Sequence, residues 1–457
     1  MIRIWVLILA LLFFQDPAAS AAPRSKKAGT VRRPVVIRPI IPAPTPAPTP
    51  ALEWRGRIYT DQYWFTAGNR PGEFEQSSVS AWLDVSSELS SQSGFRGVVQ
   101  LDAFYRDINH PDSSSARVRV REAYYSYLGE GIEFRIGQQI IPWGRSDGVN
   151  PTDYFTAKDM TLLNPDDEVR RLGAPGFNFS YTPRGGASPF TMQLVFQAAY
   201  PQMRMLIPDQ SIPPGIVFEK TAPAPDWFRS DSMEAGVKLS YQQPSFDLSI
   251  SAFRGRSQYA QYLFDLPSAS IRAVHPGETA VGADGSFTWD AQVFRFETAL
   301  RMPDNGTRED PNFGLVQPWH WDSVIGVERP LGDEFRIQAQ FLYRWHLYYP
   351  EAMTFLPVQV AVGNANALIL NYQDQGNPGG TLRLAWQKDG SNFTADVFMV
   401  GYFASGESFL IRPQVGYTPF TNMKLITGAD LYGGNPDRPL GALRSRSHLF
   451  FEAKYVF

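Results

Sequence analysis

The chain has 457 residues, of which 19% are charged and 14% are aromatic, and its formal net charge at pH 7 is -3. A charge so close to neutral gives no reason to expect nucleic acid or another polyanion held by bulk charge. The absence of cysteine excludes disulfide frameworks, thiolate metal sites and cysteine nucleophiles. A mean hydropathy of -0.25 argues against a helical membrane protein, whereas the aromatic content suits the interfacial girdles of a membrane β-barrel.

The first residues indicate secretion. Arg3 precedes an apolar run from Ile4 to Phe14, and Ala19-Ser20-Ala21 supplies the small residues that a signal peptidase needs. The run is too short for a spanning helix, which takes about 20 apolar residues. We therefore predict a cleaved signal peptide at 1–21.

A basic, proline-rich linker is expected at 22–53, on the periplasmic side. Its repeat PAPTPAPTP predicts a stiff polyproline-type spacer without a core of its own. The segment is either an unstructured leader or an arm whose basic residues contact peptidoglycan, lipid headgroups or a periplasmic partner.

From Trp54 onward the pattern is that of β-strands, in which apolar and polar residues alternate. In one such segment, Phe335, Ile337, Ala339, Phe341, Tyr343 and Trp345 alternate with Arg336, Gln338, Gln340 and Arg344. Tight turns such as Gly129-Glu130-Gly131 alternate with long polar connections, which is the outer-membrane pattern of short periplasmic turns and long external loops. Residues 54–457 are therefore predicted to form an all-β, transmembrane outer-membrane β-barrel.

The alternation of turns and loops gives a strand count. Seventeen segments are clear, and one more strand near Tyr262 to Val274 keeps both chain ends periplasmic, which gives about 18 strands with 16 as the main competitor. Glu122 shares a face with Val118 and Val120, so the fourth strand is expected to contain a bulge or to leave the membrane early.

The last stretch, Ser447 to Phe457, predicts the strand that closes the barrel. Its outward face is formed by Leu449, Phe451, Ala453, Tyr455 and Phe457. An apolar outer face and a terminal aromatic residue resemble the closing strand that outer-membrane barrels present to the barrel-assembly machinery.

The connection after the strand Ile132 to Ile141 is too long for a simple turn, and by the count it is the third external loop. Long ordered loops are usually functional. A barrel of 16 to 18 strands has a lumen wide enough for water. We therefore expect this loop to fold into the lumen and constrict it.

The block RVREAYYSYLGEGIEFRIGQQIIPWGRSDGVNPTDYFTAKDM, about 40 residues long, resembles the signature of a family of uncharacterised outer-membrane barrels related to the alginate-export barrels. The shared features are an arginine-rich strand, a G-x-Q strand end, a W-G-x-x-D turn and an N-P-x-D loop. The resemblance implies a channel or exporter whose loop lines or plugs the lumen, without identifying the substrate.

Arginines from three successive strands suggest what the lumen attracts. Alternation places Arg96, Arg106 and Arg135 on the lumen side, with Arg117, Arg119 and Arg121 between them. They either form an anion-attracting strip or pair with Asp102, Glu133 and the loop acids to hold the loop. The candidate path comprises Arg96, Arg106, Arg117, Arg119, Arg121, Arg135, Trp143, Arg145, Asp147, Asn150 and Asp153.

Enzyme, metal and cofactor functions find little support. The five histidines show no metal-ligand spacing, the loop aspartates lack an EF-hand pattern, and no nucleophile-elbow motif occurs. We expect no cofactor, no metal and no enzymatic activity, with a barrel hydrolase as the remote third hypothesis.

The predicted function is passage of a small or polymeric, anionic or amphipathic solute through a loop-constricted, arginine-lined lumen in the outer membrane. The alternative is a non-conducting surface receptor or envelope scaffold. Expected partners are outer-membrane lipid and lipopolysaccharide, the assembly machinery, and a periplasmic partner or peptidoglycan at the N-terminal arm, but no nucleic acid.

Overall fold

The computed structural model describes residues 52–66, 74–106, 114–164, 166–205, 216–219, 221–309, 315–349, 357–404 and 406–457. The description below concerns the unit Pro50–Phe457. The predicted signal peptide and nearly all of the predicted linker lie outside the described residues. The first strand begins at Leu52, so the expected boundary at residue 54 is close to where regular structure starts.

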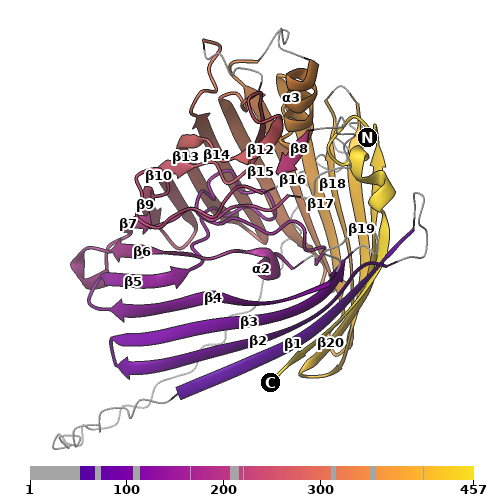
Figure 1. Ribbon diagram of the computed structural model, residues 1–457. Helices are drawn as coiled ribbons and strands as arrows, with labels where there is room; N and C mark the ends of the chain where they lie inside the picture. Colours follow the sequence, from indigo (N-terminus) through magenta and orange to yellow (C-terminus); the bar gives the residue numbers. More distant parts are fainter. Residues whose placement is uncertain are drawn as a thin grey trace, which may run out of the picture. The chain divides into compact units, whose positions relative to one another are not determined.

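Eighteen antiparallel strands form one closed sheet (Figure 1). In chain order they are β1 (Leu52–Phe65), β2 (Phe74–Ser90), β3 (Ser93–Arg106), β4 (Ser114–Leu128), β5 (Ile132–Gln139), β6 (Ala174–Tyr181), β7 (Phe190–Gln197), β9 (Glu234–Gln242) and β10 (Phe246–Arg256). They continue with β13 (Gly277–Trp289), β14 (Gln292–Pro303), β15 (His320–Leu331), β16 (Phe335–His346), β17 (Gly376–Gln387), β18 (Phe393–Tyr402), β19 (Ser408–Phe420), β20 (Met423–Gly434) and β21 (His448–Val456). The predicted count of 18 is confirmed, and the competing count of 16 is wrong.

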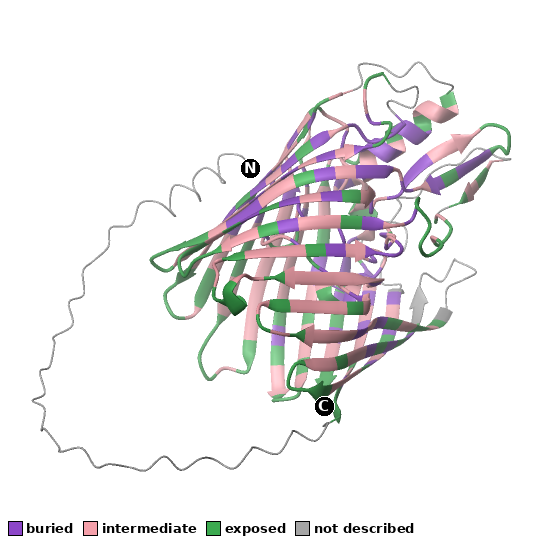
Figure 2. Cartoon of the chain, turned by 90° about the vertical axis from the view of Figure 1, so that its left-hand side faces the viewer, coloured by how far each residue is buried: buried purple, intermediate pink, exposed green. Residues whose placement is uncertain are grey.

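The closing strand β21 behaves as its pattern predicts. It pairs with β1 in an antiparallel register that runs from Arg57 opposite Val456 to Phe65 opposite His448. Its predicted outward residues Leu449 and Phe451 are exposed, whereas Phe450 is buried. Alternation of buried and exposed positions runs along the other strands too (Figure 2), with apolar side chains such as Ile250 and Ile325 facing out. This is the arrangement of a barrel whose outer face meets lipid.

One of the predicted strands is misplaced. Residues near Tyr262 to Val274 are not a barrel strand but the hairpin β11 (Gln261–Asp265) and β12 (Ser270–Val274), which joins β8 (Val217–Glu219) in a separate sheet of three strands. The barrel strand in this region is β13. Its alternation is hard to recognise in the sequence because glycine and alanine occupy many positions on both of its faces.

The irregularity expected around Glu122 is a β-bulge in β4. Val98 lies opposite Glu122 but Val99 lies opposite Val120, so Arg121 is the extra residue. Because of the bulge, Arg121 and Glu122 both reach lumen partners, Gln100 and the amide of Ile140 respectively, while Val120 stays exposed on the outside.

Short turns join the strands at one end of the barrel, and the long loops gather at the other, the external end of an outer-membrane barrel. The short helices are α2 (Asp167–Arg170), α3 (Pro357–Ile369), η1 (Arg184–Gly186) and η2 (Gly441–Arg446). None of the helices among the described residues is both long and apolar enough to cross a membrane. The third long connection, residues 140–173 between β5 and β6, is called loop L3 below.

Candidate functional site

The first half of L3 is fixed to the lumen face of β14 by one carboxylate. Glu297 accepts hydrogen bonds from the backbone N–H groups of Arg145 and Ser146, and from the Thr152 hydroxyl at 3.1 Å. Gly144 has a φ of +95°, and a Cβ at this position would lie 2.8 Å from the Glu297 carboxylate. The glycine of the W-G-x-x-D turn is therefore required for this close approach.

Charged side chains continue the attachment around the barrel. Arg145 reaches Asp284 on β13 at 2.7 Å and Asp247 on β10 at 2.8 Å. Asp147 accepts a hydrogen bond from Gln338 on β16. The side chains of these two predicted path residues thus bind L3 to three strands, β10, β13 and β16.

The aromatic residues of L3 form a core with the wall. Trp143, Tyr154 and Phe155 are at most 3% exposed and cluster with Phe253 on β10. Ring centroids are 5.0 Å apart for Trp143 and Phe155 and 5.2 Å apart for Phe155 and Phe253. Packing of the loop against the barrel wall therefore accounts for these three rings.

The second half of L3 lies against the β1–β4 sector, meaning the lumen-facing residues of β1 to β4. Arg117 contacts Asp102 at 3.2 Å and the loop residue Asp159 at 3.5 Å, and Arg119 contacts Asp102 at 2.8 Å. Arg121 donates to the backbone carbonyl of Val169 at 3.2 Å. The arginine-rich strand therefore holds the loop, as one of the two sequence hypotheses stated.

The remaining predicted arginines lie apart from L3 or outside the description. Arg96 pairs with Asp84 at 2.8 Å and Glu122 at 3.4 Å, and Arg135 pairs with Glu133 at 2.7 Å. Arg106 ends β3, but its side chain lies outside the described part of the structure. Their role in attracting a solute stays a prediction.

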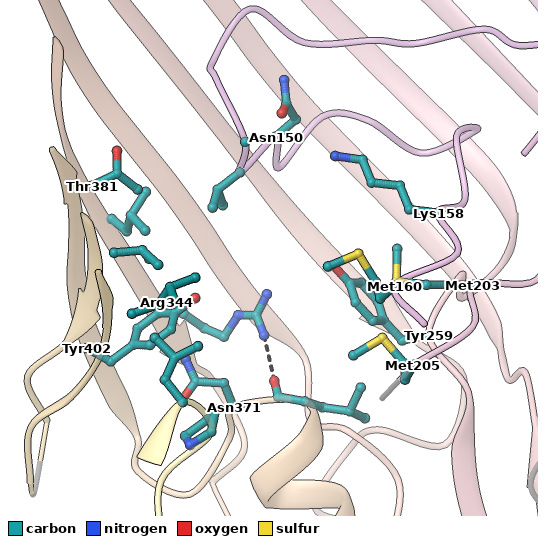
Figure 3. Close-up of a pocket in the computed structure, with 18 of the residues that line it drawn as sticks. Asn150, Lys158, Met160, Met203, Met205, Tyr259, Arg344, Asn371, Thr381 and Tyr402 are labelled. Carbon is teal, nitrogen blue, oxygen red and sulfur yellow. Dashed lines mark hydrogen bonds between the residues drawn. The ribbon is translucent and has the colours of Figure 1, made fainter. Parts of the chain in front are cut away.

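L3 leaves a cavity of about 490 Å³ along β15 to β20. Of the predicted path residues, Asn150 and Asp153 line it. Figure 3 shows Met160 from L3 together with Met203 and Met205 around Tyr259, across the cavity from Arg344, Thr381 and Tyr402.

The β15–β20 wall, meaning the lumen-facing residues of those six strands, carries apolar side chains where a porin lumen is usually polar. The apolar residues that line the cavity from this wall are Val324, Leu342, Phe398, Val400 and Leu410. Strand pairing aligns them, because Val324 lies opposite Leu342 and Val400 lies opposite Leu410. Sequence reasoning missed this band, because it appears only when the strand register is known.

Each wall arginine at the cavity has a carboxylate partner of its own. Arg344 binds Asp322 through two hydrogen bonds of 2.5 and 2.7 Å, and Arg412 binds Asp430 through two of 2.5 Å. Arg344 also donates to the Leu370 carbonyl at 2.8 Å (Figure 3). A solute carboxylate would have to displace these partners, and breaking a buried pair costs about 3–5 kcal/mol.

Arg301 on β14, a further arginine that lines the cavity, is used in the same way. It pairs with Glu278 at 2.7 Å and donates to the carbonyls of Pro151 and Asp153 in L3. On the loop side, Lys158 and Arg170 share the carboxylate of Asp167, at 2.6 and 2.9 Å. Burial raises the pKa of Asp167, but these two cations outweigh it and hold the pKa below its ordinary value.

The histidines take part in the attachment of the external loops. Within the described ranges, His275, His320, His346 and His448 each donate from Nδ1 to a backbone carbonyl, over 2.8, 2.9, 3.0 and 2.9 Å respectively. His110 lies outside the described residues. Among the described residues, no group of three or more His, Cys, Asp or Glu side chains could hold a metal ion.

Comparisons with known proteins agree with the fold. No family model and no curated protein matches the sequence, so the resemblance to the alginate-export-related barrels stays a prediction. Among solved structures, the chain is similar to Acinetobacter baumannii OccAB2, with a TM-score of 0.51 and 12% identity over 89% of this chain and 98% of that chain. It is also similar to Pseudomonas aeruginosa OccK3 (OpdO), with a TM-score of 0.53 and 10% identity over 89% of this chain and 96% of that chain. The shared feature is the closed 18-stranded fold of outer-membrane porins.

Proposed function

We propose that this chain is an outer-membrane channel that passes small amphipathic or anionic solutes between loop L3 and the β15–β20 wall. The observation that carries the proposal is the cavity of about 490 Å³ that L3 leaves along this wall. Barrels of 16 to 18 strands leave an aqueous channel in porins, and an inward-folded loop narrows such a channel.

The solute is expected to be small because L3 reaches across the lumen from β14 to β4 and narrows it. Its contacts extend from Glu297 on β14 to Arg117 and Arg121 on β4. The apolar residues of the wall favour amphipathic solutes. The arginines would favour anions only if their carboxylate partners left them with a net positive charge.

Single-channel conductance of the refolded barrel in a planar bilayer tests the proposal. Wild-type protein should give stable current, and Val400→Trp, which places an indole in the cavity, should lower it severalfold. The matched control is Val415→Trp on the outer face of β19, where Val415 is 46% exposed. Silent wild-type bilayers would instead support the receptor or scaffold alternative, and equal currents in both variants would place the path elsewhere.

The reversal potential in a salt gradient separates the two solute classes. Strong anion selectivity would support the arginine-lined path predicted from the sequence. Weak selectivity is expected if the arginines at the cavity act as neutral pairs with Asp322, Asp430 and Glu278.

The closing strand suggests a partner for assembly. Phe457 exchanges two backbone hydrogen bonds with Gly56, of 2.8 and 2.9 Å, so this residue takes part in the seam between β21 and β1. We propose that the barrel-assembly machinery recognises this strand, and that the outward apolar face then contacts outer-membrane lipid and lipopolysaccharide.

A further inference from the structure

The cavity beside L3 combines an apolar interior with wall arginines that are already paired with carboxylates, and the two features together define a class of solute. Val324, Leu342, Val400 and Leu410 form one side of it, and Met160 and Met203 belong to the other. Apolar side chains in a lumen repel hydrated ions, because an ion would lose water without gaining ligands.

Methionine gives the loop side an adaptable surface. Its unbranched thioether fits irregular apolar shapes and makes favourable contacts with aromatic rings. Met160 comes from L3, whereas Met203 and Met205 come from the connection between β7 and β9, so two loops converge on one face around Tyr259 (Figure 3). A flat or aliphatic body fits between this face and the wall.

The arginines of the β15–β20 wall do not offer an anionic headgroup a guanidinium without a carboxylate partner, and on the loop side Lys158 and Arg170 both bind Asp167. Arg344 and Arg412 each bind an aspartate through two donors, Nε and Nη2. An incoming carboxylate would leave Asp322 or Asp430 buried without its partner. A hydroxyl or carbonyl group, in contrast, can hydrogen bond to polar groups such as Asn371, Tyr259 and Tyr402 without breaking either pair.

We propose that this cavity is a binding site for an uncharged amphipathic solute, whose aromatic or aliphatic body lies between the methionine face and the β15–β20 wall. The inference rests on the proposed channel function and names its solute class. A volume of about 490 Å³ is within the range of small-molecule sites.

Equilibrium binding to the refolded full-length barrel in lipid nanodiscs tests the site independently of conduction. The probes are benzyl alcohol, benzoate and benzylammonium, which share one ring and differ in charge. Saturation-transfer NMR, corrected with empty nanodiscs, should rank benzyl alcohol as the tightest binder. Tighter binding of benzoate or benzylammonium, or no binding of benzyl alcohol above the lipid background, would overturn the proposal.

Two isosteric substitutions locate the binding. Val324→Thr combined with Val400→Thr adds hydroxyls without changing volume, and should weaken benzyl alcohol binding by roughly fivefold for each hydroxyl that is left unsatisfied. Val415→Thr, on the lipid face of β19, should leave the affinity unchanged. Equal affinity in the double variant and the control would contradict the assignment.

The binding and conductance experiments distinguish failure of the binding site from failure of the channel function. Binding of benzyl alcohol by a barrel that carries no current would support the site and reject the channel. Current without such binding would support the channel and reject the site.

Discussion

Asp153 is the loop residue whose ionisation bears most directly on how L3 is held. Its Oδ1 accepts hydrogen bonds of 3.3 Å from the backbone N–H groups of Trp143 and Thr156. Burial raises the pKa of this carboxyl to about 6, and the Trp143 N–H and Lys158 oppose the rise only in part. The folded loop therefore favours the protonated form over the range in which the unfolded loop would ionise.

The sign of the pH dependence follows from this shift. Because the pKa in the folded protein exceeds the ordinary value of 3.8, the stabilisation from the proton is present at low pH and is lost as the pH rises through about 6. Hydrogen-exchange protection of L3 amides, corrected for intrinsic rates, should fall on the order of tenfold between pH 5 and pH 8. In Asp153→Asn the dependence should disappear, and an unchanged dependence in that variant would assign it to another group.

At the scale of elements, the position of L3 depends on β14. Glu297 accepts several hydrogen bonds from the loop, so Glu297→Gln replaces a charged acceptor with a neutral one and places an amide beside two N–H donors. We expect the barrel to stay folded but L3 to become more sensitive to protease, with single-channel current that is larger and noisier.

The matched control for this change is Glu328→Gln. Glu328 also faces the lumen from a neighbouring strand, β15, but it pairs with Arg295 at 2.8 Å instead of binding L3. Its current and protease sensitivity should remain at the wild-type level. If the two variants behaved alike, the attachment of L3 by Glu297 would be wrong.

Strand elements differ in how well the sequence predicts them. Strand β16 could be recognised because large apolar residues such as Phe341 and Trp345 mark its outer face at every second position. Strand β13 could not be recognised, because L3 packs against its lumen face and requires small side chains there. A Cβ on Gly282, for example, would clash with the Tyr154 hydroxyl. The same packing that positions the loop thus removes the alternating pattern from the strand beneath it.

At the scale of the whole molecule, local sequence patterns predict the barrel and its inward-folded loop. They do not predict which part of the lumen the loop occupies and which part it leaves open. L3 occupies the β1–β4 sector, where the predicted arginines lie, and leaves the cavity at the β15–β20 wall. Pairing of Arg344 with Asp322, or of Arg412 with Asp430, depends on the register between neighbouring strands. Alternation assigns a face to each residue, but it does not assign neighbours across strands.

The division of the lumen can be tested directly because the chain has no cysteine. Thr381 on β17 lines the cavity, and Ser80 on β2 belongs to the β1–β4 sector. The two side chains are similarly buried, with 4% and 3% exposed. The hydroxyl group of each is hydrogen-bonded to a side chain of a neighbouring strand, Gln340 for Thr381 and Asp102 for Ser80. The measurement is the single-channel current of Thr381→Cys and Ser80→Cys before and after a charged methanethiosulfonate reagent. The reagent should lower the current of Thr381→Cys and leave that of Ser80→Cys constant. The reverse result would place the path through the β1–β4 sector.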